Sequence, residues 1–298
     1  MRRSLEGRVA IVTGAGSGLG REHARFLARH GARVVVNDVA EASAASAAAD
    51  IVAAGGAAMP FAASVIDEPA VHRMVDQALE RWQRVDVLVN NAGILRDKSF
   101  AKMSVEDFRA VVEVHLMGSV ICTKAVWEQM RRQRHGRIVM TTSSSGLYGN
   151  FGQANYGAAK MALVGLMQTL ALEGEKYDIR VNCLAPSAAT QMTEGILPPE
   201  SLQLLHPSLV SPGLLMLVGE DAPTRVILCA GGGHFACASL TLSQGHYVGG
   251  ADEAGERVLA HWDAVSSRSD DLVPAYGFVQ AEREVASAKA HRSARPST

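Results

Sequence analysis

Residues 9–20 read Val-Ala-Ile-Val-Thr-Gly-Ala-Gly-Ser-Gly-Leu-Gly, a short β-branched run that passes directly into a glycine-rich turn. An apolar helical pattern over residues 19–30 follows at once. Glycines allow a tight turn and bring backbone N–H groups close to a pyrophosphate, and the N-terminus of the helix adds partial positive charge. This order of strand, turn and helix predicts a dinucleotide site at Gly14, Gly16, Ser17, Gly18, Leu19 and Gly20.

The same alternation of short apolar runs and helical patterns continues to about residue 184. Nearly continuous apolar runs are typical of parallel strands that are covered on both faces. We therefore expect an α/β fold, a doubly wound Rossmann-like parallel sheet in a single domain over residues 1–280. The expected strands are residues 9–12, 33–37, 85–90, 137–142, 179–184 and, last, 235–242; the expected helices are residues 19–30, 40–54, 69–82, 105–132 and 155–176.

Composition narrows the class of protein. Hydrophobic residues make up 48% of the chain and charged residues 20%, and the formal net charge is −1. These values favour a globular cytoplasmic protein over a protein that binds nucleic acid or a membrane surface. We expect no segment near the roughly 18 apolar residues of a membrane span. The histidine spacing shows no metal-ligand pattern, and the four cysteines are expected to be buried thiols.

Two further motifs fit the dinucleotide site. Asp38 ends the second strand, where a carboxylate accepts hydrogen bonds from the adenosine ribose and repels a 2′-phosphate. Neither Ser17 nor Val39 is basic, so NAD is expected and NADP is the less favoured cofactor. Asn91, Ala92 and Gly93 close another strand, and these small residues leave room for the cofactor across the carboxyl edge of the sheet.

A catalytic constellation follows the strand at residues 137–142. Tyr156 and Lys160 are four residues apart on one helix face, and Ser143 precedes the tyrosine by thirteen residues. Reduction of a carbonyl needs a proton at the oxygen, and alcohol oxidation needs one removed; a nearby Lys⁺ and a nicotinamide ring are expected to lower the phenol pKa from about 10. Ser143 is expected to hold the substrate oxygen, although Ser144 and Ser145 are alternatives.

Together these motifs resemble the short-chain dehydrogenase/reductase family over roughly residues 5–250. Residues 90–100 and 145–156 are similar to the (3R)-hydroxyacyl-CoA dehydrogenase domain of peroxisomal multifunctional enzyme type 2. The resemblance implies a catalytic Ser143, Tyr156 and Lys160, with His115 where many family members have Asn. His115 then has either a proton-relay or a packing role. The resemblance also places Ser64 and Val65 at the adenine, and Pro186 and Thr190 at the nicotinamide. Relative to the family pattern, one residue is missing between Pro186 and Thr190.

The expected reaction is NAD-dependent hydride transfer between the cofactor and a secondary alcohol or ketone, with a 3-hydroxyacyl-CoA or a similar apolar small molecule as substrate. An NADPH-dependent 3-oxoacyl or steroid ketoreductase is the alternative within the fold, and a catalytically inactive NAD(H) sensor is the alternative outside it. We expect residues 186–217 to form a substrate loop, of which residues 196–217 close over the substrate or simply cap the sheet. Residues 281–298 form a polar, basic tail for which disorder is one expectation, and the long helices predict a homodimer or homotetramer.

Overall fold

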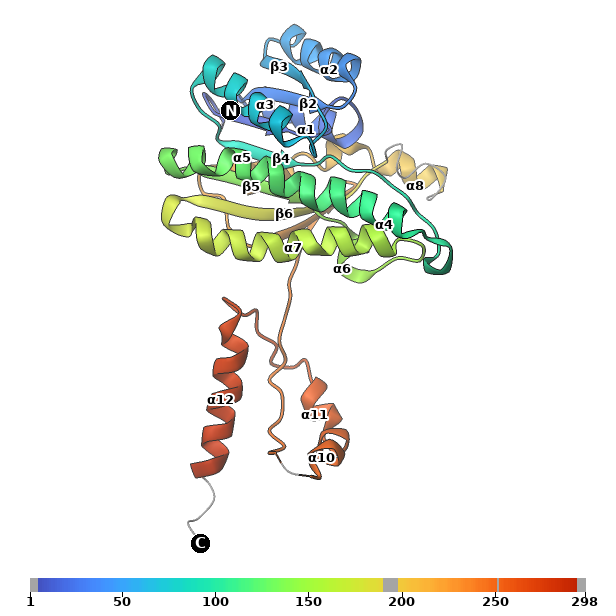
Figure 1. Ribbon diagram of the computed structural model, residues 1–298, viewed down its shortest axis with the longest axis vertical. Helices are drawn as coiled ribbons and strands as arrows, with labels where there is room; N and C mark the ends of the chain where they lie inside the picture. Colours follow the sequence, from blue (N-terminus) through green and yellow to red (C-terminus); the bar gives the residue numbers. More distant parts are fainter. Residues whose placement is uncertain (1–4, 190–197, 251, 294–298) are drawn as a thin grey trace. The chain divides into compact units, whose positions relative to one another are not determined.

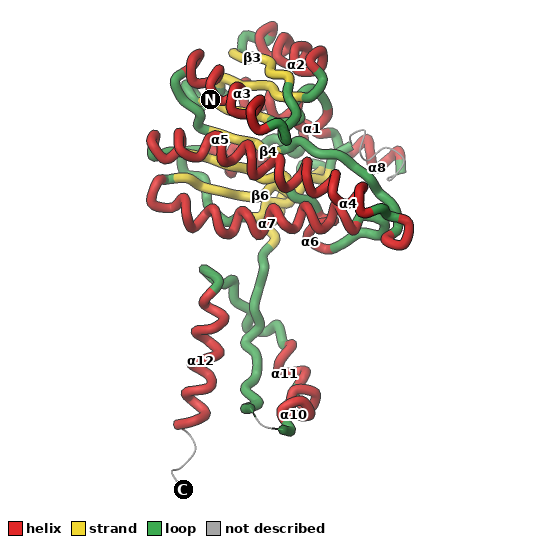
Figure 2. Tube along the Cα trace, viewed as in Figure 1, coloured by secondary structure: helices red, strands yellow, loops and turns green. Residues whose placement is uncertain are grey.

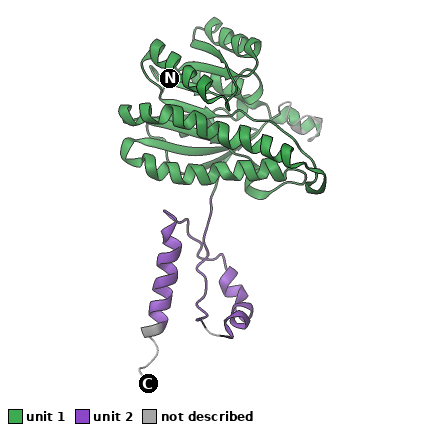
Figure 3. Ribbon diagram, in the orientation of Figure 1, with its two compact units in different colours: residues 1–238 green, residues 239–298 purple. Residues whose placement is uncertain are grey.

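The computed structural model describes residues 5–189, 198–250 and 252–293. It divides into two compact units, Met1–Ala238 and Ser239–Thr298 (Figure 3). The sequence predicted a boundary near residue 280 instead. The first unit carries all the predicted catalytic residues.

An eight-stranded sheet in the order β3-β2-β1-β4-β5-β6-β7-β8 forms the centre of the first unit (Figure 1). All neighbours pair in parallel except β7 and β8, which are antiparallel. The strand order changes direction between β1 and β4, and ligands bind at such a switch point in α/β sheets. The strands are β1 Val9–Val12, β2 Arg33–Asp38, β3 Ala57–Ala62, β4 Val87–Asn90, β5 Gly136–Thr141, β6 Ile179–Ser187, β7 Ile227–Gly231 and β8 His234–Ala238.

Helices cover both faces of this sheet, as the helix and strand colours of Figure 2 make visible. The helices of the first unit are α1 Gly18–Arg29, α2 Glu41–Ala53, α3 Glu68–Trp82, α4 Val105–Val112, α5 Gly118–Gln133, α6 Ser144–Tyr148, α7 Ala154–Gly174, α8 Pro199–Leu204 and α9 Gly213–Val218. Three short 3₁₀ turns, Phe100–Lys102, Glu175–Tyr177 and Pro207–Leu209, and a π-helical turn, Glu113–Met117, complete them.

Two apolar cores hold these layers together. Leu27 of α1, Ala47 of α2 and Leu214 of α9 are fully buried on one face of the sheet. Met74 of α3 and Met167 of α7 are buried against the other face of the sheet, where α5 also packs. Alternate residues of each strand supply the two cores, since side chains of a strand point to opposite faces. The doubly wound sheet predicted from the sequence is confirmed.

The edges of the sheet differ from the prediction. β3 and β7 were not predicted, and the last strand is His234–Ala238 rather than residues 235–242. Gly232 and Gly233 have φ of 58° and 78° and join β7 to β8 in a two-residue hairpin. Positive φ at both central residues matches the type I′ turn, whose twist suits antiparallel strands.

The long central helix meets the length and hydropathy of a membrane span over Val105–Gln133, contrary to the sequence expectation. Its buried side chains include Val111, Cys122, Val126 and Met130, of which the last three belong to the core beneath α5. A helix that packs against a protein core can have the same length and hydropathy as a membrane span, so these contacts identify a core helix. The cysteine expectation is wrong in part: Cys122 and Cys183 are buried, Cys229 is half-buried and Cys237 is exposed.

The second unit contains α10 Ala254–Ala260, α11 Trp262–Ser266 and α12 Phe278–Ser293, with an isolated antiparallel bridge between Leu242 and Leu272. None of its described residues is buried. Helix α12 occupies most of the segment for which disorder was one expectation, and Tyr276 Oη donates to Glu282 Oε1 at 2.6 Å near its start.

Candidate active site

The glycine turn lies between β1 and α1, as predicted. Gly14 and Gly18 have φ of 61° and 51°, a region that favours glycine. A Cβ on Gly14 would lie 2.9 Å from Ala92 Cα, and a Cβ on Gly20 would overlap the Gly14 carbonyl. Ser17 is the N-cap residue of the twelve-residue helix α1, yet its side chain makes no capping bond. The N-terminus of α1 therefore keeps the backbone donors that an anion needs.

The segment after β4 holds this turn in place. Asn91 Nδ2 donates to the carbonyl oxygens of Thr13 at 2.9 Å and Gly14 at 3.2 Å. The backbone N–H groups of Asn91 and Ala92 both donate to Thr13 Oγ1, at 3.0 and 3.1 Å. The two motifs predicted separately from the sequence thus form one hydrogen-bonded assembly at the switch point.

Asp38 lies at the end of β2 and contacts the same turn. Its Oδ2 accepts from Gly16 N–H at 3.0 Å, and its Oδ1 accepts from Ala40 N–H at 3.0 Å. A Cβ on Gly16 would lie 2.8 Å from Asp38 Oδ2, so only glycine lets the turn approach this carboxylate. The neighbouring Val39 side chain is 73% exposed and offers no charge.

The remaining predicted cofactor residues lie along the same edge of the sheet. Val65 is buried and faces Gly118, where an added Cβ would lie 2.5 Å from Val65 Cγ2. Ser64, half-buried, precedes it, and Pro186 is in β6 opposite Ala230 of β7. Thr190 lies outside the described residues.

The structure brings Ser143, Tyr156 and Lys160 together. Ser143 is buried at the N-cap of α6, Tyr156 lies in the first turn of α7, and Lys160 follows on the same helix. The Lys160 Nζ atom lies 5.5 Å from the centre of the Tyr156 ring and donates to Thr141 O at 2.5 Å. Ser143 is buried and its hydroxyl lowers the pKa of Tyr156, whereas Ser144 is exposed. The geometry therefore favours Ser143 among the three adjacent hydroxyls.

Burial dominates the acid–base properties of this cluster. It raises the pKa of Tyr156, which the Ser143 hydrogen bond lowers and the Asp97 charge raises further. Burial also lowers the pKa of Lys160 to about 7. The sequence predicted a lowered tyrosine pKa; in the protein by itself the shift has the opposite direction, because loss of solvation outweighs the hydrogen bond.

His115 joins the cluster from the π-helical turn. Its Nε2 lies 3.0 Å from Ile94 N and 2.8 Å from Ile94 O, and its Nδ1 is buried without a hydrogen-bond partner among the described residues. Burial, with the charge of Lys160, lowers the pKa of His115 to about 3. π-Helical turns are frequent at functional sites, and here the turn places His115 beside Tyr156.

Several polar residues of this region were not predicted from the sequence. Asn155 is fully buried: its Nδ2 donates to Arg96 O at 3.0 Å, and its Oδ1 accepts from Tyr156 N–H at 2.7 Å. Gln153 Nε2 donates to Asp97 Oδ2 at 2.6 Å. No local pattern signals such pairs, since their members are more than fifty positions apart.

The apolar insert differs in part from the predicted lid. Val210, Leu214 and Leu217 are fully buried in the core beneath α1 and α9, so this half caps the sheet. Ser211 Oγ lies 2.8 Å from Nδ1 of the buried His23 in α1, which fixes the cap further. Leu204 of α8 is 71% exposed, and residues 190–197 lie outside the described part.

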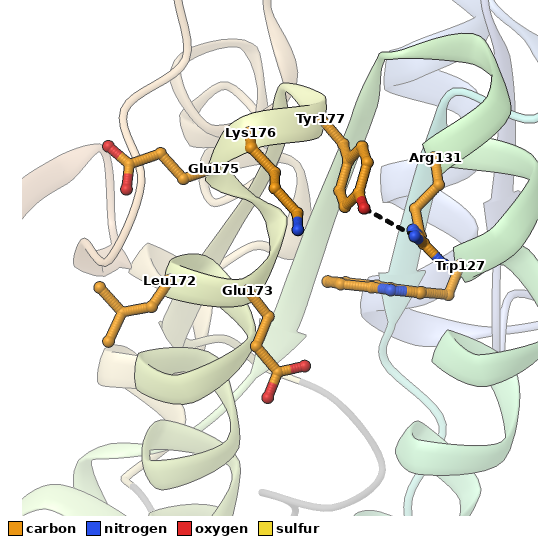
Figure 4. A pocket seen from close by; sticks show the side chains of 7 residues that line it. All are labelled: Trp127, Arg131, Leu172, Glu173, Glu175, Lys176 and Tyr177. Atoms are coloured by element: carbon orange, nitrogen blue, oxygen red, sulfur yellow. Dashed lines mark hydrogen bonds between the residues drawn. The ribbon is translucent and has the colours of Figure 1, made fainter.

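A pocket on the helical face of the first unit lies away from the catalytic residues (Figure 4). Its lining comes from the ends of α5 and α7 and the turn after α7, and Arg131 Nη2 donates to Tyr177 Oη at 2.6 Å. Sixteen helical residues separate Tyr156 from Leu172 in this lining, which corresponds to about 24 Å. The pocket is therefore not part of the catalytic site.

Comparison with known proteins agrees with this geometry. A family model described as short chain dehydrogenase matches residues 8–200. The chain belongs to the short-chain dehydrogenase family. It is an oxidoreductase of the NAD(P)-dependent short-chain type, and the family resemblance predicted from the sequence is confirmed.

Among relatives of the short-chain dehydrogenase family, a Mycobacterium tuberculosis protein described as a short-chain type dehydrogenase/reductase is 50% identical over 239 residues, 77% of this chain and 84% of the relative. Peroxisomal multifunctional enzyme type 2 of Drosophila melanogaster is 50% identical over 225 residues, which cover 72% of this chain but 37% of that enzyme.

Two solved structures show the fold likeness. The full-length Drosophila melanogaster enzyme superposes with a TM-score of 0.81 at 36% identity, covering 96% of this chain and 50% of that one. A 7α-hydroxysteroid dehydrogenase complexed with NADH and 7-oxo glycochenodeoxycholic acid has a TM-score of 0.73 at 30% identity, over 78% of this chain and 96% of that one.

Proposed function

We propose that this short-chain dehydrogenase oxidises a secondary alcohol with NAD⁺, and that its substrate is a 3-hydroxyacyl thioester or a similar apolar alcohol. The observation that supports the proposal most is the buried cluster of Ser143, Tyr156 and Lys160 at the carboxyl edge of the sheet, beside the glycine turn. A sensor protein that only binds a dinucleotide has no need of an acid–base cluster at this place.

Tyr156 acts as the general base in this proposal. The Ser143 hydroxyl binds the alcohol oxygen and orients its proton toward the Tyr156 phenol, whose pKa the same hydroxyl lowers. In its protonated form Lys160, whose Nζ donates to Thr141 O and lies 5.5 Å from the centre of the Tyr156 ring, stabilises the phenolate. His115 has a packing role against the ring of Tyr156 and the backbone of Ile94.

The residues present fit a nicotinamide dinucleotide. Gly14, Gly16 and Gly20 form a cradle that any Cβ would fill, at the N-terminus of α1. A bound nicotinamide would supply the hydride acceptor for the carbinol carbon. We assign the pyrophosphate to the glycine turn, the adenine side to Ser64 and Val65, and the nicotinamide side to Gly93 and Pro186, with Thr190 added from the family resemblance alone.

Asp38 supports NAD over NADP. Its carboxylate is fixed by two backbone N–H groups beside the glycine turn, so its position is set before a ribose binds. A 2′-phosphate there would face like charge with no basic residue at Ser17 or Val39 to offset it.

The apolar substrate is inferred from relatives and from the site surface. The Drosophila melanogaster relative is named a peroxisomal multifunctional enzyme, and this chain matches only part of it. Phe100, Tyr148 and Phe151 are each more than 70% exposed and flank segments that bear Asp97 and Tyr156. We assign them to contact with an apolar substrate.

We also propose a cytoplasmic location and a homodimer or homotetramer.

One assay panel tests the proposal. Purified protein is given NAD⁺ or NADP⁺ together with short, medium and steroid-type 3-hydroxyacyl-CoAs and the corresponding free alcohols. The proposal predicts turnover with NAD⁺ and at least one apolar 3-hydroxyacyl compound. Turnover confined to NADP⁺ would favour the NADPH-dependent ketoreductase instead, and absence of turnover with a bound dinucleotide would favour the sensor.

A further inference from the structure

The segment between β4 and the first 3₁₀ turn, residues 93–99, lies against the start of α7. Three hydrogen bonds fix it there: Asn155 Nδ2 to Arg96 O at 3.0 Å, Gln153 Nε2 to Asp97 Oδ2 at 2.6 Å, and Lys98 N to Gly152 O at 2.9 Å. Both amide side chains are buried, Asn155 fully and Gln153 with 8% exposed. Two buried side-chain amides therefore fix the backbone path of residues 93–99, more tightly than is usual for a surface loop.

This arrangement brings the Asp97 carboxylate to the start of α7, the helix that bears the catalytic phenol. Gln153 is the N-cap residue of α7, three positions before Tyr156, and its Nε2 donates to Asp97 Oδ2 at 2.6 Å. The charge of Asp97 raises the pKa of Tyr156, which also indicates that the two groups are close. The other charged or titratable groups that surround the pair are Arg96 and Lys98 on the segment, Asp107 on α4, His115 on the π-helical turn and Lys160 on α7.

These neighbours do not cancel the charge of Asp97. Lys98 Nζ donates to Asp107 Oδ2 at 2.8 Å, and Arg96 Nε lies 3.9 Å from Asp107 Oδ1, so both cations of the segment are directed to Asp107. His115 is neutral, because burial lowers its pKa to about 3. Lys160 Nζ donates to Thr141 O and lies over the Tyr156 ring, so the structure shows no ion pair between a described residue and Asp97, whose carboxylate leaves a negative charge at the start of α7.

We propose that Asp97 is a specificity-determining residue: its carboxylate disfavours substrates with a negative charge near the carbinol carbon, so that esters and thioesters are taken in preference to the matching free acids. The inference rests on the proposed oxidation of secondary alcohols and deepens it, since it defines the class of acyl derivative. A thioester carries no charge beside its carbonyl, whereas the free 3-hydroxy acid carries a carboxylate two carbons from the reacting centre.

The test compares a neutral ester with the anion of its parent acid. The value of kcat/KM is measured for methyl 3-hydroxybutyrate and for 3-hydroxybutyrate with the wild type, Asp97→Asn and Glu106→Gln. The asparagine keeps an oxygen for Gln153 while it removes the charge, and Glu106→Gln removes an equal charge from an exposed position on α4. The ester-to-acid preference should fall about three- to tenfold in Asp97→Asn, because a like charge at about 6–8 Å in a partly hydrated site costs a fraction of a kcal/mol to about 1.4 kcal/mol. It should not change in Glu106→Gln.

Salt tests the same inference on the unaltered protein. An ionic strength of about 1 M shortens the Debye length to about 3 Å, so the ester preference of the wild type should shrink toward that of Asp97→Asn. A preference that is the same in the wild type and Asp97→Asn, and insensitive to salt, would overturn the proposal.

A titration separates this inference from the proposed function. The ultraviolet difference spectrum of the phenolate, with Tyr156→Phe as the reference, gives the pKa of Tyr156 without any turnover. Asp97→Asn should lower it by about half a unit to one unit, whereas Glu106→Gln should leave it in place. If the wild type oxidised neither substrate, the proposed function would fail. The titration would still test the position of Asp97, because it needs no turnover. The same phenol pKa in the wild type and in Asp97→Asn would overturn the placement of Asp97 near Tyr156.

Discussion

The ring of His115 meets the ring of Tyr156 edge-on, with centroids 5.2 Å apart and an interplanar angle of 89°. Edge-to-face contact at this distance is a favoured aromatic geometry and restrains the ring of Tyr156. His115 is restrained in turn by the backbone of Ile94. The sequence left a proton relay and a packing role open for His115, and this contact supports packing.

The pH profile of the reaction distinguishes these two roles. Because burial lowers the pKa of His115 to about 3, the ring stays neutral above about pH 5. It therefore adds no inflection near pH 6.5 to the pH profile of kcat/KM. We predict that His115→Asn loses less than the ~100-fold expected of a proton carrier and keeps the wild-type profile of kcat/KM between pH 5 and 9. A larger loss with a displaced acidic limb would assign the proton relay to His115.

A second buried histidine makes the fold sensitive to acid. His23 is fully buried in α1, and burial lowers its pKa to about 3, while the unfolded chain has the ordinary value near 6.5. Below pH 6.5 the unfolded state therefore binds the extra proton, and the free energy of unfolding falls as the pH falls, at most by about 1.4 kcal/mol per pH unit for this group.

Chemical denaturation at pH 7, 6 and 5 checks this sign. We predict that His23→Gln has a shallower loss of stability between pH 7 and 5 than the wild type, even if its stability at pH 7 is lower because the contact with Ser211 changes. The control is His72→Gln on α3, where the side chain is about half exposed and should not alter the slope. Parallel slopes for His23→Gln and the wild type would contradict the prediction.

The outer surface of α5 and α7 predicts self-association. Leu172 is 44% exposed on α7, next to the pocket that Trp127 and Tyr177 line (Figure 4). Light scattering at micromolar concentration should give the mass of a dimer or tetramer. Leu172→Glu should shift that mass toward the monomer, because a charge would be buried in the interface, whereas Val52→Glu, at a similarly exposed site on α2, should not. A monomeric wild type would exclude this surface as a homo-oligomer interface.

Cofactor choice is predicted from Asp38. A carboxylate near 4 Å from a phosphate costs about 4 kcal/mol per pair of unit charges at an effective dielectric of 20, before solvent reduces it. Even a strongly reduced cost should favour NAD⁺ by tenfold or more in kcat/KM, since about 1.4 kcal/mol is a factor of ten. Asp38→Ser combined with Val39→Arg should narrow or reverse this ratio. Equal use of both cofactors by the wild type would show that Asp38 does not select between them.

The sequence predicted the parts of the protein that local chemistry determines. The glycine turn, Asp38 and the spacing of Tyr156 and Lys160 are each contained in a few consecutive residues, and the structure places them at one edge of the sheet. Strand β3 escaped prediction because it contains Pro60 and three alanines, which are depleted in strands, although an edge strand tolerates proline. Strand β7 is an apolar run of only five residues, and so short a run does not distinguish a strand from a buried helix segment.

What the sequence missed depends on contacts between distant segments. The bond between Gln153 and Asp97 spans 56 positions, and no periodicity marks its members. The pKa of Tyr156 was predicted in the wrong direction for the protein by itself, because the degree of burial of the phenol follows from packing. The cap formed by Leu214 and Leu217 was predicted as a lid for the same reason.

The central claim is that Tyr156 carries out the acid–base chemistry of an NAD-dependent oxidation. NADH formation from NAD⁺ and a 3-hydroxyacyl-CoA should be measured for the wild type, Tyr156→Phe and the control Tyr177→Phe, with cofactor affinity determined in parallel. We predict that turnover in Tyr156→Phe falls by at least ~100-fold while NAD affinity barely changes, and that Tyr177→Phe, at the far end of α7, stays close to the wild type. Turnover near the wild-type value in Tyr156→Phe would contradict the account.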